Sequence, residues 1–360
     1  MIKESSVVIP TEPVGSIPRP KELIDAAALH AAGQLPDDEI AGLYEAAVRD
    51  TIQRFEETGS PVISDGEQSK SSFLTYPLSG LTNLAADGVS IEFADGHARQ
   101  LPRLAEGPFA YSTFAIDYLI EAKKYASVPV KQAVIAASAL SLLYPQDGVE
   151  GYSQEAFIGD LVGEAVQDIR GCLDAGAHVV QMDFTEGRLA VKLDPSLGLL
   201  RTFIDLNNRV LSNFSDEERQ RIGIHTCPGG DIDSTHSADV DYAELLPSLF
   251  DVNVGNFYIQ LASEADRRRV LGIIAKHSRP DQRIFIGVID PINPEVETVE
   301  EVKERVLEAA EFIPVERLGT TDDCGFSPFG DDTSTSRDTA FAKIQARVEG
   351  TAAAAQVLDT

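Results

Sequence analysis

Short apolar runs alternate along this chain with longer stretches in which apolar residues recur every three or four positions. Short runs rich in branched aliphatic residues indicate buried β-strands, whereas the longer period indicates helices with one apolar face. The runs predict eight strands, at residues 7–10, 61–67, 129–135, 178–183, 222–225, 256–260, 283–290 and 317–321. The periodic stretches predict helices at residues 21–58, with a break near 33–36, and at 114–125, 154–175, 197–211, 242–249, 264–276, 297–312 and 337–354.

Regular alternation of strands and helices predicts a parallel sheet, and eight strands predict that the sheet closes into a (β/α)8 (TIM) barrel. A barrel of this kind takes about 250 residues, and this chain has 360. We therefore expect one barrel domain over residues 1–360, with a loop-rich insertion at about 76–110 that includes a small hairpin near 89–93. An open, doubly wound sheet is the alternative. It is weakened because no predicted strand is followed by a Gly-x-Gly-x-x-Gly turn.

The composition is that of a globular protein, with 43% apolar and 24% charged residues. The chain has no apolar run of about eighteen residues, and Met1 to Ser6 lack the apolar core of a signal peptide. Its three cysteines do not make a disulfide framework, so we expect a soluble cytoplasmic protein. The net charge of -28 argues against nucleic acid and anionic membranes as partners. Oligomerisation is left open.

A histidine and a cysteine follow the fifth predicted strand, where the strand gives way to a loop. Alternation along the strand places His225 and Cys227 on the same side, and Pro228-Gly229-Gly230 then ends the strand. A second cysteine, Cys324, follows the last predicted strand. Imidazole nitrogen and thiolate sulfur are preferred zinc ligands, and three ligands with an open fourth position are typical of catalytic zinc. A buried structural pair is the alternative for His225 and Cys227.

Other polar residues lie at the ends of predicted strands, where barrel enzymes place their chemistry. They are Ser16, Asp65, Glu67, Asp183, Gln260, Asp290 and Asp323. Their convergence at one end of a barrel predicts an active-site mouth. Structural alternatives exist for four of them: Ser16 and Asp290 as turn residues, Asp183 as a cap, and Glu67 as a surface partner of Lys70.

Four stretches resemble the catalytic barrel of cobalamin-independent methionine synthase, in the superfamily that also contains uroporphyrinogen decarboxylase. They are Val14-Gly15-Ser16-Ile17-Pro18-Arg19-Pro20, Ser64-Asp65-Gly66-Glu67-Gln68, Gln181-Met182-Asp183, and His225-Thr226-Cys227 with Asp322-Asp323-Cys324-Gly325. These stretches span nearly the whole chain in the expected order. The His-x-Cys pair with the late Asp-Cys-Gly is the most specific part of the resemblance.

The resemblance implies a zinc-dependent methyltransferase that methylates a small thiol, homocysteine, with methylfolate or, in short forms, another donor such as a methylcorrinoid. It implies that His225, Cys227 and Cys324 hold the zinc. It places Ser16, Glu67 and Asp183 against the amino acid part of homocysteine, with Glu67 and Asp183 also as the candidate catalytic residues. A free thiol has a pKa of about 8.5, and coordination to zinc deprotonates it so that its sulfur can attack an electrophilic carbon.

Two features depart from the family pattern. The family has a glutamate zinc ligand between the two cysteine-bearing segments, and this chain has Gln260 at the matching place. A neutral amide oxygen is a poorer zinc ligand than a carboxylate, so the predicted site is weaker unless Glu264 substitutes. His236, shortly after Cys227, is a reserve candidate. The second departure is length, because the full synthase has an additional N-terminal domain, which makes a polyglutamylated folate a less secure donor.

Other hypotheses remain beside a methyltransferase that makes methionine. The same zinc chemistry serves an enzyme that alkylates another thiol or uses another electrophile. A metal-free lyase or decarboxylase of the superfamily would use Asp65, Glu67 or Asp183 for acid–base chemistry. A binding protein without catalysis would keep the pocket alone. Cys172, on the apolar face of a predicted helix, is expected in the core under every hypothesis.

Overall fold

A parallel sheet forms the centre of the molecule in the computed structural model, which describes residues 7–359. Six of the eight predicted strands are present as regular strands, in the spatial order β12-β11-β10-β7-β6-β5. Their bounds are β5 Gln132–Ile135, β6 Val180–Asp183, β7 Ile222–Thr226, β10 Asn256–Ile259, β11 Arg283–Ile289 and β12 Leu318–Asp322. Almost every residue in them is buried, as expected for parallel strands that are covered on both faces.

Single bridges in or next to the first two predicted strands complete the ring, the first of them one residue after the predicted range 7–10. Thr11 pairs in parallel with Thr320 of β12, and Ile63 pairs in parallel with Val130, just before β5. Ile17 N–H then donates to the Gly66 carbonyl at 3.0 Å, which joins the two segments to each other. Pro10 and Pro13 lie beside the first bridge and Pro61 lies beside the second, and prolines lack the N–H that a longer strand ladder would need. The prediction of a (β/α)8 barrel is confirmed.

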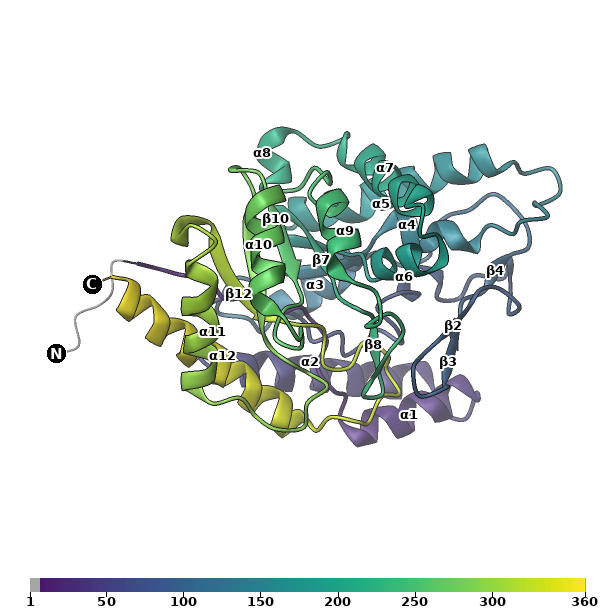
Figure 1. Cartoon of the computed structure of the whole chain (residues 1–360). Helices are drawn as coiled ribbons and strands as arrows, with labels where there is room; N and C mark the ends of the chain where they lie inside the picture. The colour runs from purple at the N-terminus through teal and green to yellow at the C-terminus, as the bar shows by residue number, and fades with distance from the viewer. Residues whose placement is uncertain (1–6, 360) are drawn as a thin grey trace.

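Helices surround the strands, as Figure 1 shows. The long ones are α1 Lys21–Ala31, α2 Asp37–Glu57, α3 Ala115–Lys123, α5 Gln154–Asp174, α7 Gly198–Leu211, α9 Tyr242–Leu249, α10 Arg267–His277, α11 Val299–Ala310 and α12 Arg337–Leu358. Each matches a predicted helix. The start of α10 differs from the predicted residue 264, because the carboxylate of Asp266 accepts from Arg269 N–H and caps the helix there. Three further helices were not predicted: α4 Ala137–Leu140, α6 Glu186–Leu193 and α8 Asp216–Arg219.

Two hairpins meet beside one end of the barrel. The predicted hairpin near 89–93 is present, with β2 Ser90–Glu92 paired to β3 Ala98–Gln100. A second, unpredicted hairpin pairs β8 Gly230–Asp231 with β9 Ser234–Thr235. Ala94 N–H donates to the Thr235 carbonyl at 3.0 Å, so the two hairpins contact each other through their backbones, and Figure 1 shows them side by side. Strands β1 Leu84–Ala85 and β4 Arg103–Leu104 pair within the same predicted insertion.

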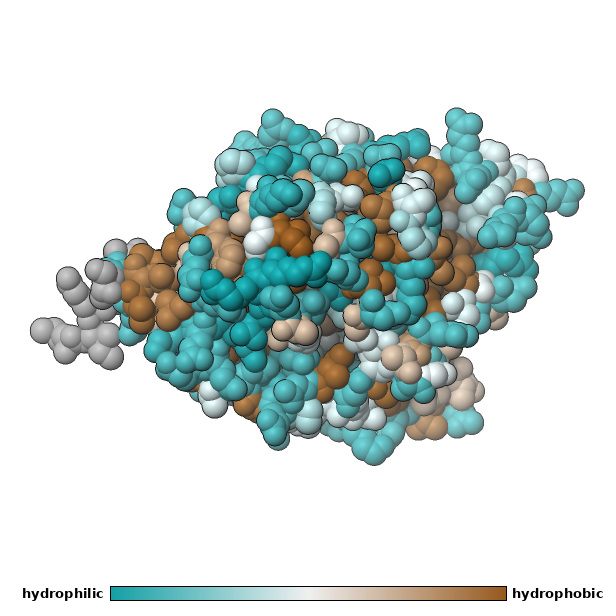
Figure 2. All heavy atoms as spheres, viewed as in Figure 1, coloured by the Kyte–Doolittle hydropathy of each residue, from teal (hydrophilic) through white to brown (hydrophobic). Residues whose placement is uncertain are grey.

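The surface in view is mostly hydrophilic, with apolar residues in small patches, as Figure 2 shows. Within residues 7–359, no helix has the length and apolar character needed to cross a membrane. Met1 to Ser6, whose sequence argues against a signal peptide, lie outside the described residues.

Candidate metal and substrate site

Three candidate metal ligands converge at the carboxyl ends of two strands. His225 is the penultimate residue of β7, Cys227 follows that strand directly, and Cys324 follows β12. One ligand atom from each residue lies within 4.8 Å of the other two. The sulfur atoms of Cys227 and Cys324 are 3.2 Å apart, and both cysteines are free thiols. These residues, which are distant in the sequence, therefore lie close together in the structure, as predicted.

The donor atoms of this group are arranged as a metal site requires. The Nδ1 atom of His225 lies 3.2 Å from the Tyr258 carbonyl, which only accepts, so Nδ1 carries the proton and Nε2 keeps a lone pair. That Nε2 atom is buried and has no hydrogen-bond partner. The neighbouring Cys227 sulfur and burial raise the pKa of the Cys324 thiol well above its usual range. A cation at this point would satisfy the imidazole lone pair and stabilise both thiolates, so the residues fit zinc.

Gln260 lies at the end of β10, and its side chain is almost fully buried. Its Nε2 atom donates to Ser263 Oγ at 2.6 Å, while its Oε1 atom is buried without a hydrogen-bond partner. The carboxylate of Asp323 holds this loop, because it accepts from the backbone N–H groups of residues 261, 262 and 263, each at 2.8 Å. Gly287 makes room for it, since a Cβ there would lie 1.9 Å from Asp323 Oδ1.

The two reserve ligands do not join the metal group. The Oε1 atom of Glu264 lies 2.5 Å from the guanidinium of Arg188, which is buried over the ring of Tyr242. The Nδ1 atom of His236 lies 2.7 Å from Ser237 Oγ. Neither residue is among the clustered His, Cys, Asp and Glu ligands of the described chain. Glu264 therefore does not replace the missing glutamate in this structure.

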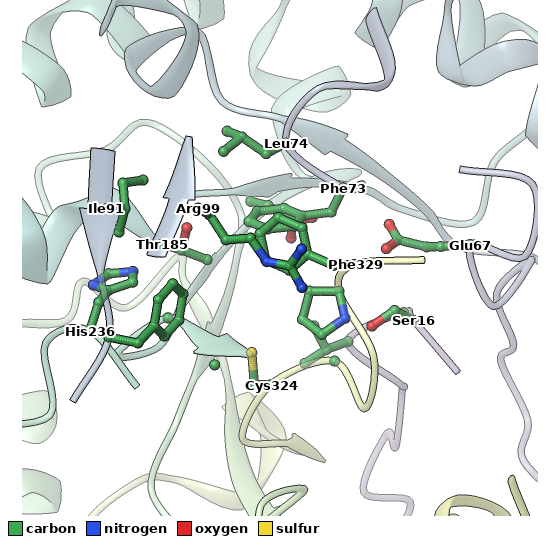
Figure 3. A pocket seen from close by; sticks show the side chains of 18 residues that line it. Ser16, Glu67, Phe73, Leu74, Ile91, Arg99, Thr185, His236, Cys324 and Phe329 are labelled. Carbon is green, nitrogen blue, oxygen red and sulfur yellow. The ribbon is translucent and has the colours of Figure 1, made fainter. Parts of the chain in front are cut away.

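A pocket opens beside Cys324, and the three predicted substrate-binding residues all line it: Ser16, Glu67 and Asp183. Figure 3 shows Ser16 and Glu67 on one side of Cys324. Ser16 Oγ accepts from Ser327 N–H at 3.2 Å, in the segment that follows Cys324. This hydrogen bond joins the first and last segments of the barrel at the pocket.

The two carboxylates of this pocket differ in their surroundings. Glu67 accepts from Lys70 Nζ at 3.1 Å, so the predicted pair exists, but both side chains are buried rather than on the surface. Glu67 also has a φ of 55°, a strained backbone conformation that such residues adopt only when their surroundings impose it. Asp183 accepts from Gln181 Nε2 at 2.7 Å, and burial raises its pKa to about 6. An ammonium group placed between Glu67 and Asp183 would offset the cost of burying them.

Arg19 is an organising residue that the sequence prediction missed. Its buried guanidinium donates to the backbone carbonyls of Glu67 and Lys70, at 2.6 and 3.0 Å, and also to that of Ser327. It therefore fixes the loop of Glu67 against the segment after Cys324. Arg19 stands between two prolines, and contacts to backbone carbonyls leave no pairing pattern in a sequence.

The remaining candidates have structural roles. Asp65 Oδ1 accepts from Glu67 N–H at 3.1 Å and so shapes the loop of Glu67. Asp290 Oδ1 accepts from Ile292 N–H at 3.0 Å, as expected for a turn residue. Cys172 is fully buried in the core, as predicted.

The fold and the clustered ligands define a barrel protein with a candidate metal centre at the carboxyl ends of its strands. Residues 9–348 match the family described as cobalamin-independent synthase, catalytic domain. The chain belongs to this family, which supports an enzyme of the methyltransferase class.

Several known proteins resemble this chain over nearly its whole length. Methionine synthase of Saccharolobus solfataricus is 22% identical over 345 residues, which cover 96% of this chain and 94% of that protein. A B12-independent methionine synthase from Shewanella sp. W3-18-1, solved in complex with selenomethionine, superposes with a TM-score of 0.77 at 19% identity, covering 98% of this chain and 99% of that one. A putative vitamin-B12 independent methionine synthase from Listeria monocytogenes gives a TM-score of 0.72 at 22% identity, with coverage of 96% and 98%. These structures share the fold.

Proposed function

We propose that this protein transfers a methyl group to a small thiol such as homocysteine, with zinc held by His225, Cys227 and Cys324. The observation that carries the proposal is the convergence of these three donor atoms within 4.8 Å, beside a pocket that also contains Ser16, Glu67 and Asp183. Zinc bound there supplies the positive charge that keeps an incoming thiol deprotonated at neutral pH.

The protein's own residues would position the substrate. Glu67 and Asp183 would bind the ammonium group, and the Ser16 hydroxyl would donate to the carboxylate of the amino acid. Ser16, Glu67 and Asp183 are all buried, which excludes water and strengthens these interactions. The thiol would then lie toward Cys324, with its sulfur free to attack the methyl carbon of a donor.

Gln260 would change the charge around a zinc ion held by His225, Cys227 and Cys324. Its unpartnered Oε1 atom is the neutral oxygen that the sequence places where the family has a carboxylate. Replacing an anionic ligand by a neutral one lowers the negative charge around the metal by one, so the site would hold zinc less tightly and activate a thiol more strongly.

The metal content of the purified protein tests the proposal. We expect about one zinc per chain, and loss of that zinc in the Cys324→Ser variant. Cys172→Ala is the matched control, because it removes a cysteine of the core and should leave the zinc in place. Zinc-loaded protein should then convert homocysteine to methionine with a suitable methyl donor. Absence of zinc even after its addition in excess, or equal zinc in both variants, would contradict the proposal and favour a metal-free lyase.

A further inference from the structure

The pocket beside Cys324 has two ends of different character. Figure 3 shows Ser16 and Glu67 on one side of Cys324, and Ile91 and His236 on the other. If the amino acid part of the thiol occupies the first end, its sulfur lies near Cys324. The second end then gives the methyl donor an approach to the sulfur within this pocket, because the carbon that is attacked has to lie beyond the sulfur.

Aromatic and aliphatic side chains form this second end. Phe93 and Ile91 come from the β2–β3 hairpin, and Phe73 and Phe329 come from segments on the other side of the pocket. Phe93 is held in place, since its ring stacks on His97 with centroids 4.3 Å apart and meets the edge of His236 at 5.4 Å. We call the space between these side chains the aromatic compartment.

The charges around the aromatic compartment favour a cation. Of the described side chains that line the pocket, Arg99 alone carries a permanent positive charge. Its guanidinium lies over the ring of Phe329, 4.2 Å from the ring centroid, and it also contacts two carboxylates, Asp231 at 2.5 and 3.2 Å and Asp331 twice at 2.9 Å. The two carboxylates carry one more formal charge than the guanidinium, with Asp231 buried and also 3.0 Å from His97 Nε2, and Asp331 exposed to solvent. His236 carries no positive charge at neutral pH, because burial lowers its pKa to about 4.

From these observations, and resting on the proposed function, we infer that the methyl donor is an onium cation: a sulfonium or a quaternary ammonium compound. Aromatic faces attract such cations, which is how quaternary ammonium groups are commonly recognised. An anionic donor such as a methylfolate would find no free cation in the compartment to offset its charge.

The chemistry of the transfer points the same way. With trimethylsulfonium as donor, a lone pair of the substrate thiolate forms the new S–C bond, and one C–S bond of the donor breaks. The electrons of that bond stay on the donor sulfur, so dimethyl sulfide leaves as a neutral molecule while the charges of thiolate and donor cancel. An uncharged donor would instead release an anion into an apolar compartment, which is costly.

Binding of trimethylsulfonium to the zinc-loaded protein, without homocysteine, is the first measurement. Titration calorimetry should show that trimethylsulfonium binds about tenfold more tightly than tert-butanol, which has a similar size and no charge. Phe93→Leu keeps an apolar side chain but removes the ring, and it should weaken trimethylsulfonium binding about fivefold. Phe312→Leu is the matched control, because Phe312 is a half-buried phenylalanine that does not line the pocket. If Phe93→Leu disturbs the hairpin, Phe73→Leu provides the same test from the opposite wall.

Turnover separates this inference from the proposed function. With homocysteine added, we expect methionine and dimethyl sulfide in equal amounts. If methylfolate methylates homocysteine while trimethylsulfonium neither binds nor reacts, the donor class is wrong and the proposed function stands. Equal binding of trimethylsulfonium and tert-butanol also overturns the inference. If homocysteine shows no zinc-dependent binding while trimethylsulfonium binds as expected, the proposed function fails and the preference of the compartment for onium cations stands.

Discussion

Gly325 lies so close to Ser16 that no side chain fits between them. A Cβ atom at position 325 would lie 2.1 Å from Ser16 Oγ. Gly325→Ala should therefore displace the serine and lower the free energy of unfolding by about 1–3 kcal/mol, and it should weaken binding of the proposed substrate, homocysteine. Gly42→Ala is the control, because a Cβ there meets nothing within 4 Å. That control in α2 should be neutral or stabilise by up to about 1 kcal/mol. Urea unfolding of the two variants checks this prediction, and similar results for both would contradict it.

A buried carboxyl group in α6 should make the stability depend on pH. Glu186 is buried with a hydrogen bond from Ser138 Oγ, and burial raises its pKa to about 8. The unfolded pKa is about 4.3, so the folded state binds the proton more tightly, and this group costs stability increasingly as the pH rises from about 4 to 8. Glu186→Gln should thus leave stability nearly unchanged at pH 4 and raise it by about 2–4 kcal/mol at pH 7. Denaturant unfolding at both pH values measures this, and an equal difference at both would refute it.

Residue chemistry explains which site residues could be predicted. His225, Cys227 and Cys324 are recognisable because few side chains bind zinc and because strand alternation fixes their side. Arg19 was missed, since it acts through backbone carbonyls that any sequence supplies. Whether Glu264 could act as a reserve ligand could not be decided from the sequence, because its partner, Arg188, lies far away in the sequence and is brought to it only by the fold.

Turn chemistry limits what could be predicted about the elements. The β8–β9 hairpin turns through Ile232 and Asp233, which have φ values of 45° and 55°. Turns of that kind are normally signalled by Asn-Gly, because β-branched residues rarely adopt positive φ. The sequence Ile-Asp gives no such signal, so this hairpin was not predicted, whereas the long helices and the apolar strands were. The bridge at Ile63 lies within the second predicted strand, whereas the first bridge, at Thr11, lies one residue after the predicted range 7–10. The reduction of both strands to single bridges depends on neighbouring segments.

Weakening the contact between the two hairpins should loosen the hairpins locally without unfolding the rest of the protein. The carboxylate of Asp231 is buried and accepts from Arg99, and it also lies 3.0 Å from Nε2 of His97. Asp231→Asn removes the charge of this contact, so backbone hydrogen exchange in residues 90–100 should accelerate about tenfold. Asp87→Asn is the control, because its pair with Arg103 is exposed. Exchange followed by mass spectrometry makes the comparison, and no difference between the variants would show that the contact is not needed.

The charge of the whole molecule predicts a dependence on salt. A formal net charge of -28 makes the folded state repel itself, and the hydrophilic surface in Figure 2 leaves these charges in contact with solvent. Screening at about 0.3 M NaCl should therefore raise the melting temperature above its value at about 0.01 M. A neutral sugar at the same osmolality is the control. A melting temperature that falls as salt is added would mean that attractive ion pairs outweigh the repulsion.

The way the barrel closes decides when the pocket can exist at all. Ser327 binds Ser16 across 311 residues of sequence, and Thr320 pairs with Thr11. During synthesis, the pocket therefore cannot form until β12 and the segment after Cys324 have left the ribosome. Such distant pairings form slowly. A nascent chain lacks the complete group of His225, Cys227 and Cys324, so uptake of the proposed zinc would be tied to the final closure of the ring and would report when that closure occurs.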